Sequence, residues 1–120
     1  LIKIANKNIK FLNWTNNIKK YFLKSDLFIL SSYYEGLPNA LIEAAYYSIP
    51  SISTDCSGAK DILSNNKGGY IIPINNLIEL KKKISLIIEN YKDAKKKTLF
   101  AKKNVSNFSI LNCEKYHQLF

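Results

Sequence analysis

Two glutamates, Glu35 and Glu43, are the residues of this chain whose type and spacing could do chemistry, with seven residues between them. Pro38 stands between them, and proline suits the first position of a helix because its missing N–H would have no partner there. Glu35 is therefore expected on a loop and Glu43 on the helix that follows. A carboxylate in apolar surroundings needs hydrogen bonds, and the free amides at a helix start can receive an anion. A sugar nucleotide carries both the hydroxyl groups and the phosphates that such a region would bind.

Alternating strands and helices must position this junction. The expected strands are Ile9–Leu12, Leu27–Leu30, Ser51–Thr54 and Tyr70–Ile72. The expected helices run from Asn16 or Asn17 to Leu23, and over Pro38–Tyr47, Gly58–Leu63, Leu77–Asn90, Lys92–Asn104 and Ile110–Leu119. This alternation is typical of a parallel sheet with helical crossovers. The sequence therefore predicts an α/β fold, a Rossmann-like parallel sheet flanked by helices.

Several short motifs follow one another in an order that carries a family resemblance. They are Ser25–Ser32, Glu35–Glu43, Ile49–Asp55, Asp61–Leu63, Gly68–Tyr70 and Pro73. From about residue 8 to its end, the chain resembles the C-terminal domain of family 4 retaining glycosyltransferases, which have the GT-B fold. The variants Ser32–Gly36 and Ser53–Cys56 are similar to those of bacterial transferases that add N-acetylhexosamines to lipid-linked glycans. The resemblance implies transfer from a UDP-hexose or UDP-N-acetylhexosamine, with retention, to a glycan or lipid-linked acceptor.

The resemblance also implies roles for the two glutamates. Glu43 is expected to accept hydrogen bonds from the ribose hydroxyls of the donor. Glu35 is expected to be the catalytic residue, contacting a hydroxyl of the donor sugar and helping to stabilise the transition state. The structural alternatives are a partly exposed helical glutamate at position 43, and at position 35 a carboxylate that the helix dipole favours.

Further donor-binding residues are expected around this junction. Gly36 would let the ligand approach the backbone closely, and the amides of Leu37, Asn39 and Ala40 would meet the sugar or the diphosphate. Asn13 and Trp14 are expected to flank the nucleotide base, the alternative being a tryptophan packed at a strand end. The list of expected donor-binding residues is therefore Gly36, Leu37, Asn39, Ala40, Glu43, Asn13 and Trp14.

Residues 1–120 are expected to be a partial C-terminal, donor-binding domain. The chain contains no methionine and starts at Leu1. In the family that the chain resembles, this domain begins with a further βαβ unit carrying a basic pair for the donor diphosphate, and an N-terminal domain binds the acceptor. Neither is apparent here, so the isolated polypeptide is expected to be inactive.

The charge of the chain restricts its partners. Its formal net charge is +9, and all 18 basic residues are lysine. Because arginine is the preferred residue for reading base edges, nucleic acid is not expected as a partner. Between residues 81 and 103, nine lysines stand against two acidic residues. These lysines predict either a solvated helix face or contact with an anionic membrane surface.

Cofactors and disulfides are not expected. Cys56 and Cys113 are too few for a disulfide framework or a zinc site, so the expected location is the cytoplasm. Contact of the lysines with an anionic membrane would make the protein peripheral at the inner face of that membrane. The chain offers one histidine, His117, and no clustered carboxylates, so no metal is expected. Three alternatives stay open: a non-catalytic remnant, a basic module for membrane or nucleic acid, and another doubly wound nucleotide-binding domain, although the sequence has no G-x-G-x-x-G motif.

Overall fold

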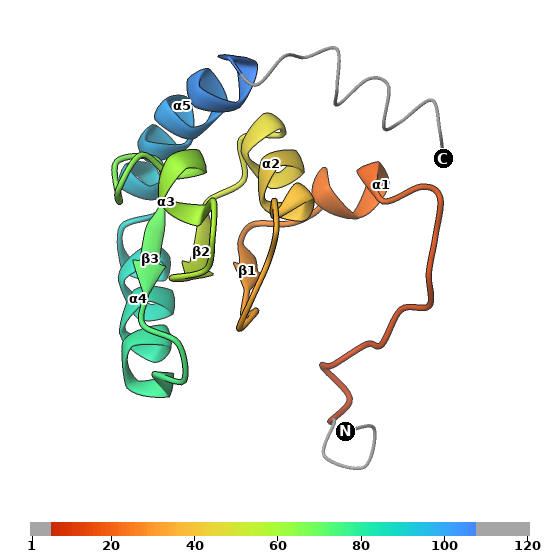
Figure 1. Cartoon of the computed structure of the whole chain (residues 1–120). Coiled ribbons are helices and arrows are strands. Elements are labelled where there is room, and N and C mark those ends of the chain that lie inside the picture. Colours follow the sequence, from red (N-terminus) through yellow and green to blue (C-terminus); the bar gives the residue numbers. More distant parts are fainter. Residues whose placement is uncertain (1–5, 108–120) are drawn as a thin grey trace.

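The computed structural model of the chain describes residues 6–107 (Figure 1). Its centre is a three-stranded parallel sheet in the order β1-β2-β3, formed by Phe28–Leu30, Ser51–Thr54 and Tyr70–Ile72. Ile52 of β2 is in register with Ile29 of β1 and with Tyr70 of β3. Parallel strands cannot be joined by tight turns, so helices make the crossovers. The predicted Rossmann-like α/β class is confirmed.

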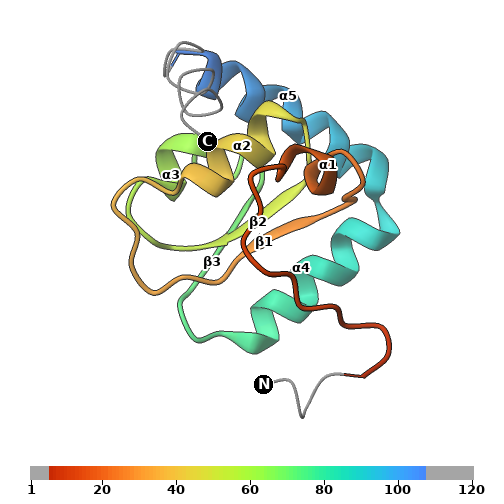
Figure 2. The same cartoon turned by 90° about the vertical axis from the view of Figure 1, so that its right-hand side faces the viewer.

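Within residues 6–107, five helices accompany the sheet. They are α1 (Lys19–Phe22), α2 (Asn39–Tyr46), α3 (Ala59–Ile62), α4 (Leu77–Glu89) and α5 (Tyr91–Asn107). Figure 2 shows α2, α3 and α5 on one side of the sheet and α4 on the other. The layers follow from the alternation of side chains along each strand. Phe28, Leu30 and Ile71 contact the core formed with α2, α3 and α5, whereas Ile52 and Ile72 contact Ile87 of α4.

Most predicted elements are found within one or two residues of their expected bounds, and β2 and β3 have the bounds expected. Pro38 precedes α2 as its N-cap rather than occupying its first position. The first helix is shorter than expected and begins at Lys19. The predicted helix Ile110–Leu119 lies outside the described residues.

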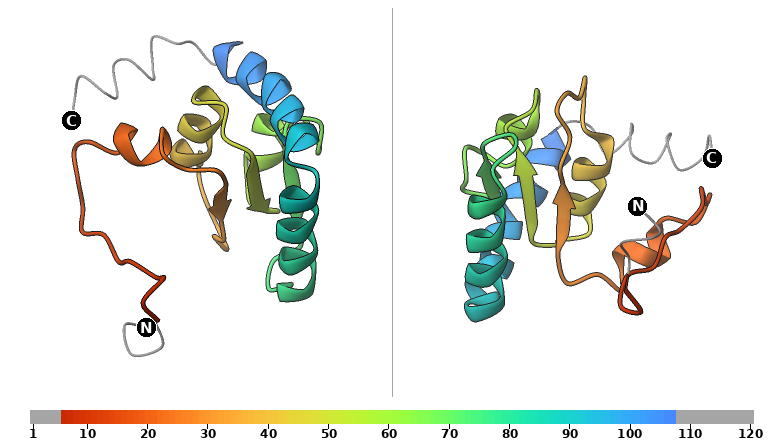
Figure 3. Two further views of the ribbon diagram at one scale, coloured as in Figure 1. Left: turned by 180° about the vertical axis from the view of Figure 1, so that it is seen from behind. Right: turned by 90° about the horizontal axis from the view of Figure 1, so that it is seen from below.

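The predicted strand Ile9–Leu12 is wrong. This segment has no regular secondary structure, and Ile9, Phe11 and Leu12 are about half exposed. Figures 1 and 3 show the segment before α1 running away from the sheet. A strand needs a neighbouring strand to bond its backbone amides and carbonyls, and among residues 6–107 no strand lies beside this segment. Its apolar pattern alone therefore cannot form a strand here.

Two adjacent glycines allow close packing, Gly68 against α5 and Gly69 against β2. A β-carbon at Gly68 would lie 2.8 Å from the backbone nitrogen of Ala101, and one at Gly69 would lie 2.8 Å from the carbonyl oxygen of Ser51. Neither backbone atom can move far, so only glycine fits at these positions. No helix within residues 6–107 is long and apolar enough to cross a bilayer.

Candidate functional site

Glu35 lies on the loop after β1, at the carboxyl edge of the sheet, and is half-buried. Its Oε1 accepts a hydrogen bond of 2.7 Å from the hydroxyl of Ser32. The backbone carbonyl of Ser32 accepts a 2.5 Å hydrogen bond from the hydroxyl of Thr54, the last residue of β2. Thr54 at the end of β2 thus holds the backbone of Ser32, and the side chain of Ser32 holds one carboxylate oxygen of Glu35. The orientation of this carboxylate depends on two strands.

Glu43 lies one turn into α2. The residues on either side of it, Ile42 and Ala44, are buried in the protein, whereas Glu43 itself is half-buried. Its Oε2 atom is buried. Asn39 stands four residues earlier and therefore on the same helical face. The carboxylate is on the helix and near its beginning, as predicted; contact with a ribose stays a prediction.

Gly36 borders open space. A β-carbon added there would meet no protein atom within 4 Å. Gly36 is also absent from the residues with positive φ, so this position needs neither the small size nor the left-handed freedom of glycine for folding. Gly36 therefore leaves room beside the loop for another molecule, as close approach of a ligand would require.

The amides at the start of α2 differ in their hydrogen bonds. The amide of Asn39 donates to the carbonyl of Leu37 at 2.8 Å and so closes a local turn. The amides of Leu37 and Ala40 donate to no acceptor within the part of the chain that the structure describes. Of the three amides expected to meet the donor, these two remain able to bind an anion without breaking a bond of the fold.

Gly58, the N-cap of α3, packs closely against Pro38 at the end of the same loop. It caps α3 in the left-handed region, with φ +80°, and a β-carbon there would lie 3.0 Å from Cδ of Pro38. On the other side of the strand ends, the hydroxyl of Tyr33 donates to Oδ1 of Asn75 at 2.5 Å. The loop between β1 and α2 is therefore held by the chain that follows β2 and by the chain that follows β3.

One cation lies near the end of β2. Lys60 Nζ is 3.1 Å from Oδ2 of Asp55, and both side chains are about half exposed. An exposed ion pair of this kind contributes little to stability. Because so weak a pair can open, Lys60 is the first residue to examine as a partner for the donor diphosphate, and that role stays a prediction.

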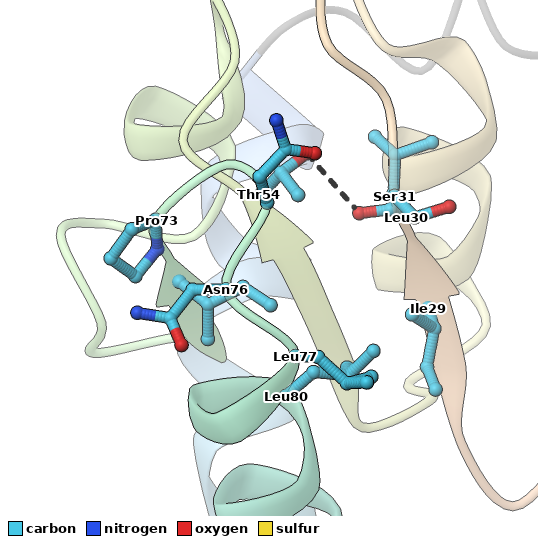
Figure 4. Close-up of a pocket in the computed structure, with 10 residues that line it drawn as sticks. Ile29, Leu30, Ser31, Thr54, Pro73, Asn76, Leu77 and Leu80 are labelled. Carbon is cyan, nitrogen blue, oxygen red and sulfur yellow. Dashed lines mark hydrogen bonds between the residues drawn. The ribbon is translucent and has the colours of Figure 1, made fainter.

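A cavity of about 270 Å³ lies at the carboxyl ends of the strands (Figure 4). Its polar lining includes Ser31 and Thr54, and its apolar lining includes Ile29 and Leu80. The cavity lies on the α4 side of the sheet and includes neither of the two glutamates. That both carboxylates face one cleft stays a prediction.

Asn13 and Trp14 lie apart from the strand ends. Both are exposed, Trp14 at 80%, in the segment that Figure 1 shows extending away from the sheet. No hydrogen bond or ion pair within the described residues joins them to the loop that carries Glu35. The structure therefore does not bring them together with the other expected donor-binding residues, and their role beside a base stays a prediction.

Two residues that position Glu35 were not predicted from the sequence. Ser32 and Thr54 were not expected to act on Glu35, although together they orient it. Ser32 and Glu35 are three residues apart, but no local signal in the sequence indicates that their side chains bond each other. Nothing in the sequence near Thr54 indicates that it bonds a loop 22 residues earlier. Within residues 6–107, no three histidine, cysteine or acidic side chains are grouped to hold a metal ion.

A parallel sheet with helical crossovers, and with polar loops gathered at its carboxyl edge, defines an α/β domain of the Rossmann-like class. The chain belongs to the family of glycosyl transferases group 1, whose pattern matches residues 3–104. This range includes every residue of the candidate site. Membership of a glycosyltransferase family is thus confirmed, whereas family 4 and a retaining mechanism stay predictions.

Among the relatives of this chain are two proteins named for their transferase activities. The chain is 31% identical over 110 residues to the GalNAc-alpha-(1->4)-GalNAc-alpha-(1->3)-diNAcBac-PP-undecaprenol alpha-1,4-N-acetyl-D-galactosaminyltransferase of Campylobacter jejuni, covering 91% of this chain and 31% of that protein. It is 32% identical over 71 residues to the UDP-Gal:alpha-D-GlcNAc-diphosphoundecaprenol alpha-1,3-galactosyltransferase of Escherichia coli, covering 59% of this chain and 18% of that protein. The chain therefore spans about a third or less of the length of these relatives.

A solved structure shows the same fold. The C-terminal domain of a glycosyl transferase group 1 family protein (LpcC) from Francisella tularensis matches with a TM-score of 0.71 at 20% identity. The match covers 82% of this chain and 51% of that domain. At this identity the likeness concerns the fold alone, and the fold is that of a GT-B glycosyltransferase domain.

Proposed function

We propose that this chain is the nucleotide-sugar-binding part of a retaining glycosyltransferase. The observation that carries the proposal is the loop at Glu35, where a fixed carboxylate, open space beside Gly36 and two amides without acceptors lie next to one another in sequence. This combination supplies hydrogen bonds for sugar hydroxyls and a binding place for phosphate. The family match over residues 3–104 supports the assignment.

The proposed donor is a UDP-hexose or UDP-N-acetylhexosamine, and the proposed acceptor is a glycan or a lipid-linked glycan. The names of the two relatives support this choice, because one gives a UDP-linked sugar and both give an undecaprenol-linked acceptor. We accordingly propose that the longer protein acts in the cytoplasm, at the inner face of the membrane. No metal or cofactor is part of the proposal.

The proposed mechanism uses the polar groups at the start of α2. Glu43 accepts hydrogen bonds from the ribose hydroxyls and so positions the nucleotide. Glu35, held by Ser32, contacts a hydroxyl of the sugar while the bond from the anomeric carbon to the diphosphate breaks. The amides of Leu37 and Ala40 point fixed dipoles at the negative charge that grows on the leaving diphosphate. Dipoles aligned in advance need no reorganisation during the reaction.

We further propose that residues 1–120 form only part of the donor-binding domain. β1 pairs with β2 along one edge, and its other edge has no strand beside it within residues 6–107. The exposed segment Ile9–Leu12 lies on that same side of the molecule (Figure 1). A further βαβ unit at this edge would cover β1 and supply the strand partner that Ile9–Leu12 lacks. An acceptor-binding domain would complete the enzyme.

Titration calorimetry of the isolated chain with UDP and with UDP-N-acetylglucosamine tests this proposal. The basic pair that the resemblance implies for the diphosphate is not apparent in residues 1–120, and a hydrogen bond to a charged group contributes about 1.5–3 kcal/mol. Losing two such bonds weakens binding by roughly two to four decades, because 1.4 kcal/mol is tenfold. We therefore expect no tight binding and no transfer. Micromolar binding, or product formed by this chain alone, would contradict the partial-domain proposal.

In the longer enzyme, kinetics separate the two glutamates. Glu43→Ala should raise the KM for the donor, because ribose contacts exist in both the ground state and the transition state. Glu35→Ala should mainly lower kcat, because its contact with the sugar strengthens during transfer. If both variants kept the kinetics of the parent enzyme, neither residue would belong to the mechanism.

A further inference from the structure

The lysines of α4 and α5 do not form one continuous surface. These two helices contain nine of the 18 lysines of the chain, but several of them bend back onto the protein. Lys95 and Lys97 donate to backbone carbonyls at 2.8 and 2.6 Å. The ammonium of Lys102 lies 5.9 Å from the ring centre of Tyr46. Lysines on the flanks of α5 therefore take part in packing, and the free charge of the helix lies elsewhere.

The outer face of α5 carries that charge. It is a stripe formed by Lys92, Lys96, Leu99 and Lys103, at the spacing i, i+4, i+7 and i+11 that places side chains on one face. The buried face has the same spacing two positions further on, at Ala94, Thr98, Ala101 and Val105. Two residues turn an α-helix by about 200°. The outer stripe of α5 therefore points directly away from the protein core, and Figure 1 shows α5 at the outside of the molecule.

The outer stripe combines charge with apolar surface. Leu99 is 67% exposed, and the neighbouring Phe100 is 55% exposed. The ammonium of Lys96 lies 3.9 Å from a carboxylate oxygen of Asp93, with both side chains largely exposed. Within residues 6–107, neither Lys92 nor Lys103 forms an ion pair. Leu99 and Phe100 thus place two exposed apolar side chains beside these lysines.

We propose that the outer stripe of α5, with Phe100 beside it, docks on the surface of an anionic phospholipid bilayer. The three lysines would lie at the level of the lipid phosphates, and Leu99 and Phe100 would enter the boundary between head groups and acyl chains. Nucleic acid fits this surface less well, because exposed leucine and phenylalanine add nothing to phosphate binding and the chain has no arginine. The proposal does not depend on donor binding.

Sedimentation of the chain with vesicles tests whether the lysines of α5 bind anionic lipid. Binding is expected to vesicles of phosphatidylcholine with added phosphatidylglycerol, and not to phosphatidylcholine alone. Because each lysine near the surface contributes about fivefold in affinity, Lys96→Gln with Lys103→Gln should weaken binding about 25-fold. The matched control, Lys7→Gln with Lys10→Gln, removes the same charge from the exposed segment before α1 and should leave most of the binding. Equal losses in the two double variants would overturn the assignment to α5.

A tryptophan reporter tests insertion. Leu99→Trp in a Trp14→Phe background should shift its emission to shorter wavelength when anionic vesicles are added. The wild-type chain is the control, because its single tryptophan, Trp14, lies in the segment before α1 and should not shift. Unshifted emission at position 99 on bound vesicles would contradict the proposal. Binding of an RNA or DNA duplex as tight as that of anionic vesicles would also overturn it, in favour of a general phosphate-binding surface.

Discussion

Gly58→Ala is expected to destabilise the chain through the loop that carries the candidate site. Gly58 has φ +80°, and an L-residue in the left-handed region loses about 1–2 kcal/mol. The smaller entropy of the unfolded alanine chain offsets about 0.4–1 kcal/mol of this loss. The new methyl group would also lie 3.0 Å from Cδ of Pro38, so the start of α2 would have to shift. We expect a net loss of about 1–2 kcal/mol.

Urea denaturation and thermal melting measure this loss, which corresponds to a fall in Tm of about 4–8 °C. Gly36→Ala is the matched control: its β-carbon meets nothing within 4 Å, so stability should stay the same or rise by up to about 1 kcal/mol. In a Pro38→Ala background the crowding disappears but the backbone strain remains, so part of the Gly58→Ala effect should be lost. A Gly58→Ala chain as stable as the wild type would refute both the left-handed cap and its contact.

Three further substitutions test the attachment of two helices and the packing of two strands. Asn104→Ala removes the side-chain amide through which α5 bonds the backbone of α3, and chemical denaturation should show a loss of about 1–2 kcal/mol. Asn76→Ala removes the N-cap of α4, which accepts a 3.0 Å hydrogen bond from the amide of Glu79; the expected loss is about 1 kcal/mol, with reduced helicity by circular dichroism. Gly69→Ala forces a β-carbon to 2.8 Å from the carbonyl oxygen of Ser51 and should lower stability by about 1–3 kcal/mol; an unchanged midpoint would mean that β2 and β3 are less closely packed.

The elements with strong local signals could be predicted from the sequence. Ser51–Thr54 follows a proline and lies in the buried middle of the sheet, so its bounds match the expected ones. The 3.6-residue period of α4 likewise gave its bounds within one residue. Ile9–Leu12 has an equally apolar pattern but failed, because a strand depends on a neighbour that local sequence does not report. An apolar pattern indicates that a segment could be buried as a strand. Whether a neighbouring strand is present to pair with it depends on the rest of the chain.

The candidate site could be predicted in part. The motif placed Glu35 on a loop and Glu43 on a helix, and the structure has them there. It could not indicate that Thr54 orients the loop of Glu35, because that contact joins residues far apart in sequence. The number of lysines also does not show which of them are free to meet a partner. Lys97 bonds a backbone carbonyl, whereas Lys96 points outward. Such differences come from tertiary packing and not from composition.

A titration of the ¹⁵N-labelled chain with UDP and UDP-N-acetylglucosamine, followed by two-dimensional NMR, tests donor binding at the Glu35 loop most directly. NMR detects the weak binding expected of a partial domain, and it reports on each amide. We predict progressive shifts centred on the amides of Gly36, Leu37, Ala40 and Glu43, larger with UDP than with uridine because the phosphates bind at the start of α2. Absence of shifts at millimolar ligand, or shifts centred on α4 and α5 instead, would contradict a donor site at this loop.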